Sequence, residues 1–191
     1  MKLIDISKNV FKSYVYPGDP TPQMKSEFRI ANGDKCNLTS IVMCCHNGTH
    51  VDAPYHFIED GKKIGDITLS KFIGECRVII AEDILTEEYA KKILSFDSKK
   101  VLLKGKTEIT IEAAECLATG GIDLLGVESC TVGNEVTGEK IHKILLGKEI
   151  VILESLELGE VEEGTYFIFA QPVNLGEVDG APCRAVLVKE V

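Results

Sequence analysis

Three of the four histidines in this chain fall between positions 46 and 56. His46, His50 and His56 share that short segment, HNGTHVDAPYH, with Asp52. Imidazole and carboxylate groups are the usual ligands of zinc, manganese and iron(II), and histidine is the side chain whose pKa lies nearest neutral pH. This density of ligand types predicts a metal site that also moves protons.

The spacing within the segment favours an extended backbone over a helix. All four side chains occupy even-numbered positions, so an extended chain would point them to one face. A helix would place His46 near His50 but would turn Asp52 away. Because His46 and His50 would lie roughly 13 Å apart on an ideal strand, they need a kink to share an ion. We expect that kink at Asn47-Gly48.

Two residues far along the chain could complete the site. His142 falls on a predicted helix at 140–146, and Glu154 follows a predicted strand at 150–153. Active-site groups of α/β sheets collect at the carboxyl ends of strands, and a buried carboxylate needs a cation or hydrogen-bond donors. Residue types alone leave simpler interpretations open: His142 and Glu154 could face water, Asp52 could bond to a turn, and His56 could cap a loop.

Composition limits the class of protein that must position these groups. The chain has 191 residues, of which 45% are hydrophobic and 27% charged, as expected for one globular domain spanning 1–191. Its apolar runs are far shorter than the roughly 20 residues that span a bilayer. Asp5 interrupts the apolar segment that a signal peptide would need, so we expect a cytoplasmic protein. With a net charge of -9 and no basic cluster, we expect no nucleic-acid partner.

The seven cysteines form no CxxC pair and are odd in number. Reduced thiols, most of them in the core, are the expected state. A thiol enzyme using Cys44 or Cys45 with His46 is an alternative of a different class. It is disfavoured because neighbouring strand residues point to opposite faces and no orienting acid lies near Cys44 in the sequence.

The remaining pattern predicts a mixed α/β fold. Short strands are expected at 2–6, 13–16, 27–30 and 39–45, separated by turn formers at 17–20 and 32–34. Later strands at 77–81, 101–104, 123–127, 150–153, 166–170 and 184–189 alternate with helices at 87–94, 111–118 and 140–146. Thr110 is placed as an N-cap, and Gly120 and Gly147 as helix ends. This order predicts sheet packed on sheet with helices at one side.

The motif His46-x-Gly48-Thr49-His50-x-Asp52-Ala53-Pro54-x-His56-Phe57 resembles the signature of the cyclase-type metal-dependent hydrolases, the family of bacterial kynurenine formamidase and isatin hydrolase. The resemblance runs the length of the chain. Further matching segments follow in the family's order, at 5–7, 17–20, 69–74, 142–146, 150–156, 172 and 179–185.

The resemblance implies a swivelling β/β/α type of fold and an oligomer, either a homodimer or a homotetramer. It also implies one or two divalent ions per chain, with zinc expected first and manganese as the alternative. The implied ligands are His46, His50, Asp52, His142 and Glu154. In this arrangement Asp52 bridges an ion held by His46 and His50 to a second ion held by His142 and Glu154.

The implied chemistry is hydrolysis of a small amide by metal-activated water, with His56 as the proton carrier. The leading substrate is an N-formyl arylamine such as N-formylkynurenine, which would make the protein an arylformamidase of tryptophan catabolism, acting on a C–N bond other than a peptide bond. Cyclic-amide opening of the isatin type, or metal binding without turnover, are the alternatives.

Three departures from the family concern the pocket wall more than the ligands. Tyr16 stands where kynurenine formamidases carry a tryptophan that stacks near the substrate, and we expect it to contact substrate here. Glu128-Ser129 replaces an aspartate and a serine, and Cys44-Cys45 replaces small polar residues. The metal chemistry is therefore expected to persist, whereas the substrate could differ.

Overall fold

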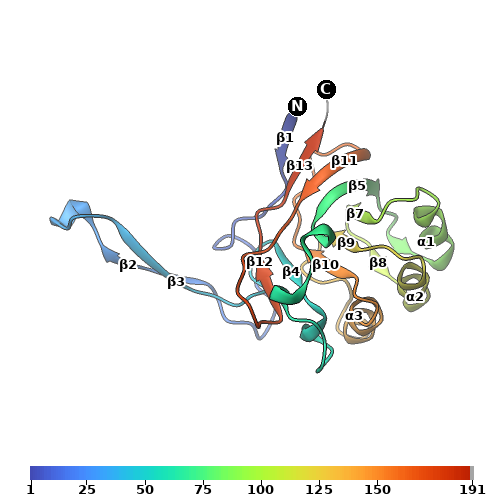
Figure 1. Cartoon of the computed structure of the whole chain (residues 1–191), viewed down its shortest axis with the longest axis horizontal. Helices are drawn as coiled ribbons and strands as arrows, with labels where there is room; N and C mark the ends of the chain where they lie inside the picture. Colours follow the sequence, from blue (N-terminus) through green and yellow to red (C-terminus); the bar gives the residue numbers. More distant parts are fainter. Residues whose placement is uncertain (190–191) are drawn as a thin grey trace.

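A nine-stranded mixed sheet forms the framework of the computed structural model, which describes residues 1–189 (Figure 1). Its strands are β1 Lys2–Asp5, β4 His50–Asp52, β5 Ile73–Ile80, β7 Lys100–Lys104, β9 Leu124–Val127, β10 Val151–Glu154, β11 Gly164–Phe169, β12 Gly180–Pro182 and β13 Val186–Lys189. They lie in the order β1-β13-β11-β5-β7-β9-β10-β4-β12. The mixed α/β fold predicted from the sequence is confirmed.

The centre of the sheet is parallel, and helices cover one of its faces. Strands β5, β7, β9 and β10 pair in parallel and are joined by α1 Glu87–Leu94, α2 Ile111–Thr119 and α3 Gly138–Leu146. All three helices lie on the same side of the sheet (Figure 1). Leu103 packs toward the helices and Leu102 toward the other face, so β7 is apolar at consecutive positions.

The second face of the sheet packs against itself. The antiparallel strands β1, β13 and β11 extend one side of the parallel centre, and β4 and β12 extend the other. A single apolar cluster joins Val51 of β4, Leu102 of β7 and Leu187 of β13. One curled sheet therefore encloses this core, because accumulated strand twist lets a wide sheet fold over its own face. From the sequence we expected two packed sheets to enclose it. The expectation of two packed sheets was wrong, whereas the prediction that the helices lie at one side of the sheet is confirmed.

The helix boundaries follow local capping chemistry. Helix α1 has the predicted bounds, and Thr110 caps α2 by accepting the backbone N–H of Ala113 at 3.1 Å. Gly120 ends α2 in a right-handed conformation, and Gly121, with φ +72°, makes the left-handed turn expected one residue earlier. Within residues 1–189, no helix combines the length and the apolar character required to cross a membrane.

A two-stranded arm projects from the body (Figure 1). It consists of β2 Gln23–Phe28 and β3 Leu38–Val42, which pair antiparallel and are exposed at every position. These strands replace the ones predicted at 27–30 and 39–45, while the strand expected at 13–16 is irregular backbone. A separate short pair, β6 Ile84–Leu85 with β8 Glu108–Ile109, precedes α1 and α2.

The cysteines are less buried than the sequence suggested. All seven lie within the described residues and are free thiols. Cys76 is buried, Cys36 is exposed and the other five are partly exposed, so the expectation that most belong to the core was wrong. One of these five, Cys130, lies in the wall of the cavity described below.

Candidate metal centre

Strand β4 brings His50 and Asp52 to the centre of the candidate site. The strand lies between β10 and β12, and its register pairs His50 with Glu154 at the end of β10. Alternate residues of a strand share a face, so the side chains of His50 and Asp52 point the same way. His50 Nε2 lies 3.3 Å from Asp52 Oδ1 and 3.4 Å from Glu154 Oε2.

A turn, and not a continuous strand, brings His46 to the same place. Gly48 has φ +69°, and a Cβ there would lie 2.9 Å from the side chain of Val10, so this position suits glycine. The turn lets His46 Nδ1 approach Asp52 Oδ1 to 2.9 Å. The predicted kink at Asn47-Gly48 is confirmed, but the single extended face from position 46 to 56 was wrong because the strand covers only positions 50–52.

His56 reaches the site through a second irregular segment. Residues Pro54–His56 form one turn of 3-10 helix, which folds the chain back over the strand that precedes it. The imidazole of His56 stacks on that of His46, with ring centroids 4.1 Å apart. Its Nδ1 lies 3.3 Å from Asp179 Oδ2, which leaves Nε2 as the ring nitrogen available for exchange with a ligand.

His142 and Glu154 complete the cluster from the parallel part of the sheet. His142 lies on α3, and its Nε2 is 3.6 Å from Asp52 Oδ2 and 3.5 Å from Glu154 Oε1. Glu154 Oε1 also accepts the backbone N–H of Val132 at 2.9 Å. The structure thus brings together all six side chains nominated for metal binding and proton transfer, from segments almost a hundred residues apart.

Backbone carbonyls fix the tautomers of the two most buried imidazoles. His50 Nδ1 donates to Gly48 O at 3.0 Å, and His142 Nδ1 donates to Gly138 O at 2.7 Å. The Nε2 lone pair of each neutral ring therefore points at carboxylate oxygens, which is repulsive unless a proton or a cation lies between them.

The unpartnered atoms of the cluster indicate a cation. Within the described part of the chain, His50 Nε2 and Asp52 Oδ2 are buried and have no hydrogen-bond partner. Burying a polar atom without a hydrogen-bond partner costs free energy. Both atoms lie among the nitrogen and oxygen atoms of the other cluster side chains. The donor set and its burial fit a divalent ion of the zinc or manganese type.

The carboxylates of the site raise the pKa values of its imidazoles, so without a metal ion the imidazoles hold protons. Burial alone would lower the pKa of His46, but hydrogen bonds to Asp179 and Asp52 raise it to about 10. Burial is likewise outweighed at His142, where Asp52 and Glu154 raise the pKa to about 10. Burial would raise the pKa of Asp52, yet hydrogen bonds from the surrounding imidazoles hold it well below its usual value. The site therefore holds positive charge strongly.

Asp179 is a site residue that we did not nominate from the sequence. Its Oδ2 lies 2.8 Å from His46 Nε2 as well as 3.3 Å from His56 Nδ1, so one carboxylate contacts both stacked imidazoles. Its hydrogen bond with His46 lowers the pKa of Asp179 far below the usual range. The available signal was an acid directly before the Gly180-Ala181-Pro182 segment, but nothing in the spacing linked it to positions 46 and 56.

A cavity of about 340 Å³ opens over the cluster. Tyr16, the predicted substrate contact, lies in its wall together with Tyr14. The remaining lining residues include five of the six cluster side chains, the ring of Phe57, and residues of the loop before α3. Phe57 stacks on His142 with ring centroids 4.4 Å apart, which supplies an apolar surface beside the ligands.

The other departures from the family motif have structural roles. Glu128 does not line the cavity; its carboxylate accepts the backbone N–H groups of Gly105 and Leu158 at 2.6 and 2.7 Å and so joins two loops. Burial raises the pKa of the Cys45 thiol, and Cys44 Sγ accepts the backbone N–H of His46 at 3.5 Å. Because nucleophilic cysteines need a lowered pKa, the raised pKa of Cys45 disfavours this residue as the nucleophile of a thiol enzyme.

Comparison with known sequences identifies similar proteins over the whole chain. The pattern of the family described as "Putative cyclase" matches residues 4–134. The kynurenine formamidase of Delftia acidovorans (strain DSM 14801 / SPH-1) is 32% identical over 203 aligned positions, which cover 97% of each protein. The alignment therefore spans nearly all of the chain.

Solved structures share the fold. A protein described as a potential metal-dependent hydrolase with cyclase activity superposes with a TM-score of 0.81 at 28% identity, covering 100% of this chain and 99% of that one. Isatin hydrolase A from Labrenzia aggregata superposes with a TM-score of 0.84 at 21% identity, covering 99% of this chain and 94% of that one. The likeness confirms the fold type that the sequence resemblance implied.

Proposed function

The chain belongs to the Putative cyclase family, and on that premise we propose that it is a metal-dependent hydrolase that cleaves a C–N bond of a small N-formyl arylamine, with N-formylkynurenine as the leading substrate. The observation that carries the proposal is the buried cluster in which the Nε2 atoms of His50 and His142 face carboxylates. The kynurenine formamidase relative, aligned over nearly the whole chain, supports the substrate class.

We propose that one or two divalent ions, zinc or manganese, bind the side chains of His46, His50, Asp52, His142 and Glu154. When bound, such an ion supplies Lewis-acid polarisation of a carbonyl and activation of water near neutral pH. How these ligands divide between two ions stays a prediction, because His50 Nε2 lies almost equally close to Asp52 and Glu154.

His56 is the proposed proton carrier. Asp179 accepts from its Nδ1 and fixes the ring orientation, so Nε2 takes the proton from the attacking water and returns it to the leaving nitrogen. A positioned acid–base group of this kind contributes about 10²- to 10⁴-fold in rate. The stacked ring of His46 and the edge contact with Phe57 hold the imidazole at the cavity wall.

The cavity wall fits a small aromatic substrate. Tyr14 and Tyr16 both line the cavity, and Phe57, stacked on His142, provides an apolar surface next to the cluster. A cavity of about 340 Å³ is at the lower end of the range typical for small-molecule sites. We propose that Tyr16 contacts the aryl ring, while the formyl group points toward the cluster.

A substrate panel tests this proposal. Protein loaded with zinc or manganese should hydrolyse N-formylkynurenine and formanilide much faster than acetanilide, and a chelator should abolish the rate. Isatin in the same panel detects cyclic-amide opening, and faster turnover of isatin than of formanilide would contradict the formamidase assignment. No turnover of any amide by protein that has bound metal would favour a metal-binding protein without catalysis.

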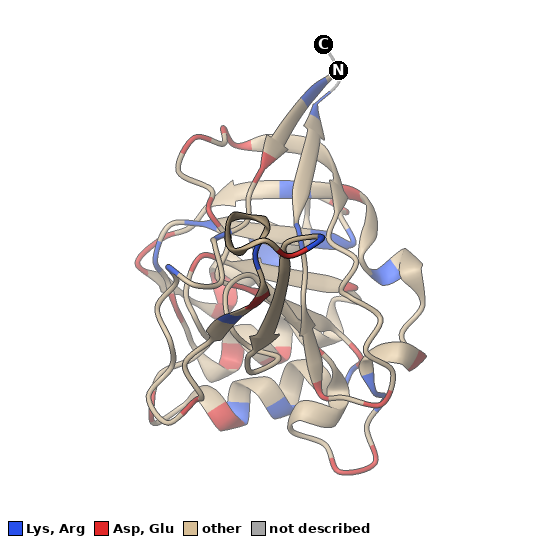
Figure 2. Cartoon of the chain, turned by 90° about the vertical axis from the view of Figure 1, so that its left-hand side faces the viewer, with Lys and Arg blue, Asp and Glu red and all other residues tan. Residues whose placement is uncertain are grey.

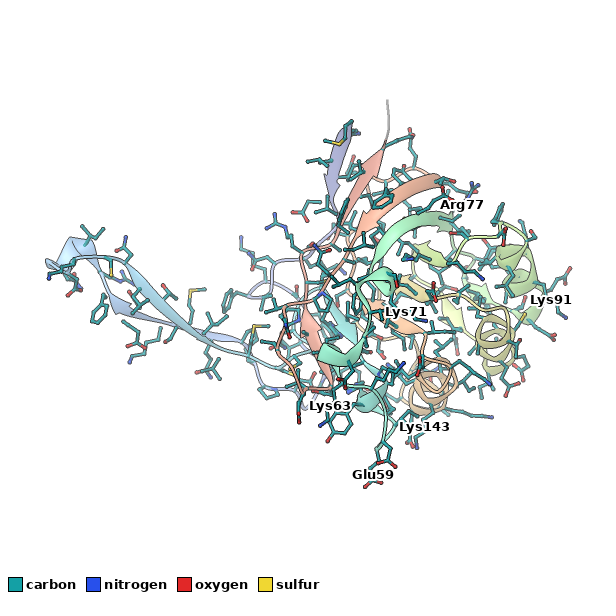
Figure 3. All side chains as sticks on the ribbon, viewed as in Figure 1. Glu59, Lys63, Lys71, Arg77, Lys91 and Lys143 are labelled. Carbon is teal, nitrogen blue, oxygen red and sulfur yellow. The ribbon has the colours of Figure 1, made fainter. Side chains whose placement is uncertain are left out.

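We also propose that the chain forms a homodimer or a homotetramer in which the arm packs on a second copy. An isolated two-stranded hairpin is marginally stable in water, yet this one stands free of the body, with its side chains open on both sides of the ribbon (Figure 3). Its large apolar side chains are exposed by 47–70%: Met24, Phe28, Ile30, Leu38, Ile41 and Val42.

Charge also favours a second copy as the occupant of the arm. Residues 21–43 carry three basic and two acidic side chains, whereas the whole chain has a net charge of -9. In the association that we propose, the slightly basic arm would contact the acidic body of the second copy. Figure 2 looks along the arm and shows the positions of the Asp and Glu residues (red) and the Lys and Arg residues (blue) on the body behind it. Burying one large apolar side chain contributes about 1.5–3 kcal/mol, and two-fold symmetry doubles the number buried.

Light scattering tests the association. The unchanged protein should have the mass of a dimer or a tetramer. Met24 and Ile41 are register partners on one face of the arm, and replacing both with serine should shift the mass to that of a monomer. Lys25→Ser, on the opposite face, is the matched control and should leave the mass unchanged. A monomeric unchanged protein would contradict the proposal.

We further propose a cytoplasmic location. The seven free cysteines support it, because such thiols persist in a reducing compartment.

A further inference from the structure

Ser155, directly after the proposed ligand Glu154, has a strained backbone. Its φ of +59° lies in the left-handed region, which non-glycine residues seldom adopt, and the residue is 5% exposed. Glycine would fit this position without strain, so its absence calls for a physical reason. Strained residues persist only where surrounding contacts fix them, and they cluster at functional sites.

Hydrogen bonds fix Ser155 from both sides. Its backbone N–H donates to Ser129 O at 2.8 Å, and its carbonyl accepts the hydroxyl of Thr49 at 2.6 Å. The same hydroxyl oxygen accepts the backbone N–H of Lys8 at 2.8 Å. Thr49 is 1% exposed, so its Oγ1 joins three chain segments inside the protein.

The two residues mark the end of the ladder between β4 and β10. The register ends with the pair His50–Glu154, and the next pair would be Thr49 with Ser155. The left-handed turn at Ser155 takes the chain out of the ladder. The Thr49 hydroxyl then makes the cross-strand contact that a backbone group would otherwise make, one residue away from each of two proposed ligands.

We propose that Thr49 and Ser155 form a positioning clamp that fixes Glu154 relative to His50 and thereby sets the metal affinity of the site. The clamp rests on the proposed function, because it acts through the proposed ligands. Neither residue touches the ion or the substrate. The left-handed conformation of Ser155 turns the backbone directly after Glu154. The carboxylate of Glu154 thereby stays directed at the Nε2 atoms of His50 and His142.

Removal of the Thr49 hydroxyl tests the first half of the clamp. Thr49→Val keeps the side-chain shape but leaves Ser155 O and the Lys8 N–H without their partner. We expect zinc or manganese to bind about 10- to 100-fold more weakly in competition with a chromophoric chelator, as found when groups that orient ligands are lost. Thr49→Ser keeps the hydroxyl and should stay within about threefold of the unchanged protein.

Substitutions at Ser155 test the second half of the clamp, because stability and metal affinity should change in opposite directions. Ser155→Gly removes the strain and keeps both backbone hydrogen bonds, so the thermal midpoint of the metal-free protein should stay equal or rise. Metal affinity should fall about tenfold, because glycine lets the backbone after Glu154 adopt more conformations. Ser155→Ala retains the strain and should leave metal affinity unchanged. A purely structural role would instead lower stability and leave the affinity of the folded protein unchanged.

The outcomes separate this inference from the proposed function. Failure of the unchanged protein to bind metal would overturn both. If the unchanged protein binds metal and Thr49→Val or Ser155→Gly binds it equally well, the clamp is overturned while the proposed function stands. Should Thr49→Val fail to fold, the affinity and thermal midpoint of Ser155→Gly decide the question.

Discussion

Two parts of the site differ in burial and in what holds them. The inner cluster, defined as His50, Asp52, His142 and Glu154, is 1–4% exposed, and backbone groups orient its side chains. The outer trio, His46, His56 and Asp179, has side chains that are 12%, 27% and 39% exposed. In the outer trio, imidazole and carboxylate orient one another at the edge of the cavity.

This difference indicates a division of labour. A dry site with fixed tautomers holds a cation tightly, because its ligands need no reorganisation and water competes poorly. A proton carrier must instead exchange protons with substrate and solvent, which requires partial exposure and one free ring nitrogen. His46 contacts Asp52 of the inner cluster and Asp179 of the outer trio, and so connects the two parts.

Asp52→Asn should have the largest effect, because Asp52 contacts three imidazoles. Metal affinity should fall more than about 100-fold, since a ligand is lost and not merely an orienting group. Equilibrium dialysis with zinc measures this directly. Asp60→Asn, the same change on an exposed turn, is the control. Unchanged affinity in Asp52→Asn would remove the inner cluster as the metal site.

His56→Ala should separate the two parts most sharply. The inner cluster stays intact, so metal content should not change, while kcat should fall about 10²- to 10⁴-fold through loss of the proton carrier. Metal analysis and steady-state kinetics on the same preparation provide both readouts. A variant that loses its metal along with its activity would make His56 a ligand, and the distinction between inner cluster and outer trio would then be wrong.

Asp179→Asn should have a smaller effect of the same kind. Asparagine keeps the shape but weakens the bond that orients His56, which should lower kcat about tenfold. Metal affinity should fall less than in Asp52→Asn, because Asp179 does not belong to the proposed ligands but contacts one of them, His46, at 2.8 Å. An unchanged kcat would show that Asp179 does not act through His56.

Metal-free protein should lose stability as the pH rises. The pKa of His46 is about 10 in the folded protein and 6.5 when unperturbed, so its stabilising contribution is complete below about pH 6.5 and is lost as the pH rises through about 10. The loss between pH 6 and pH 10 should be on the order of 4 kcal/mol. Urea unfolding in chelator at pH 6 and pH 10 measures it. His46→Gln should flatten the decline; greater stability at pH 10 in the unchanged protein would contradict the assignment.

The inner cluster could be predicted largely from sequence, and the outer trio only in part. His50 and Asp52 alternate on a strand, which spacing reveals, and Glu154 ends an apolar run that predicts a buried strand. Asp179 escaped nomination because its contacts with His46 and His56 depend on two irregular turns, and local spacing carries no information about how such turns fold back.

The fold shows the same limit. Strand and helix periodicity located the parallel centre and the bounds of α1, because those elements are governed by local capping and burial. Whether the antiparallel strands form one curled sheet or two depends on long-range pairing, such as β1 with β13 across the length of the chain. The arm was missed as a unit because its exposed apolar residues resemble those of a strand in a core.

Titration of metal-free protein with zinc or manganese tests the central claim most directly. Hydrolysis of a formylated arylamine, followed together with bound metal, should rise in proportion to metal bound by the inner cluster and His46 and should saturate at one or two ions per chain. Full hydrolytic activity in protein that contains no metal would contradict the account.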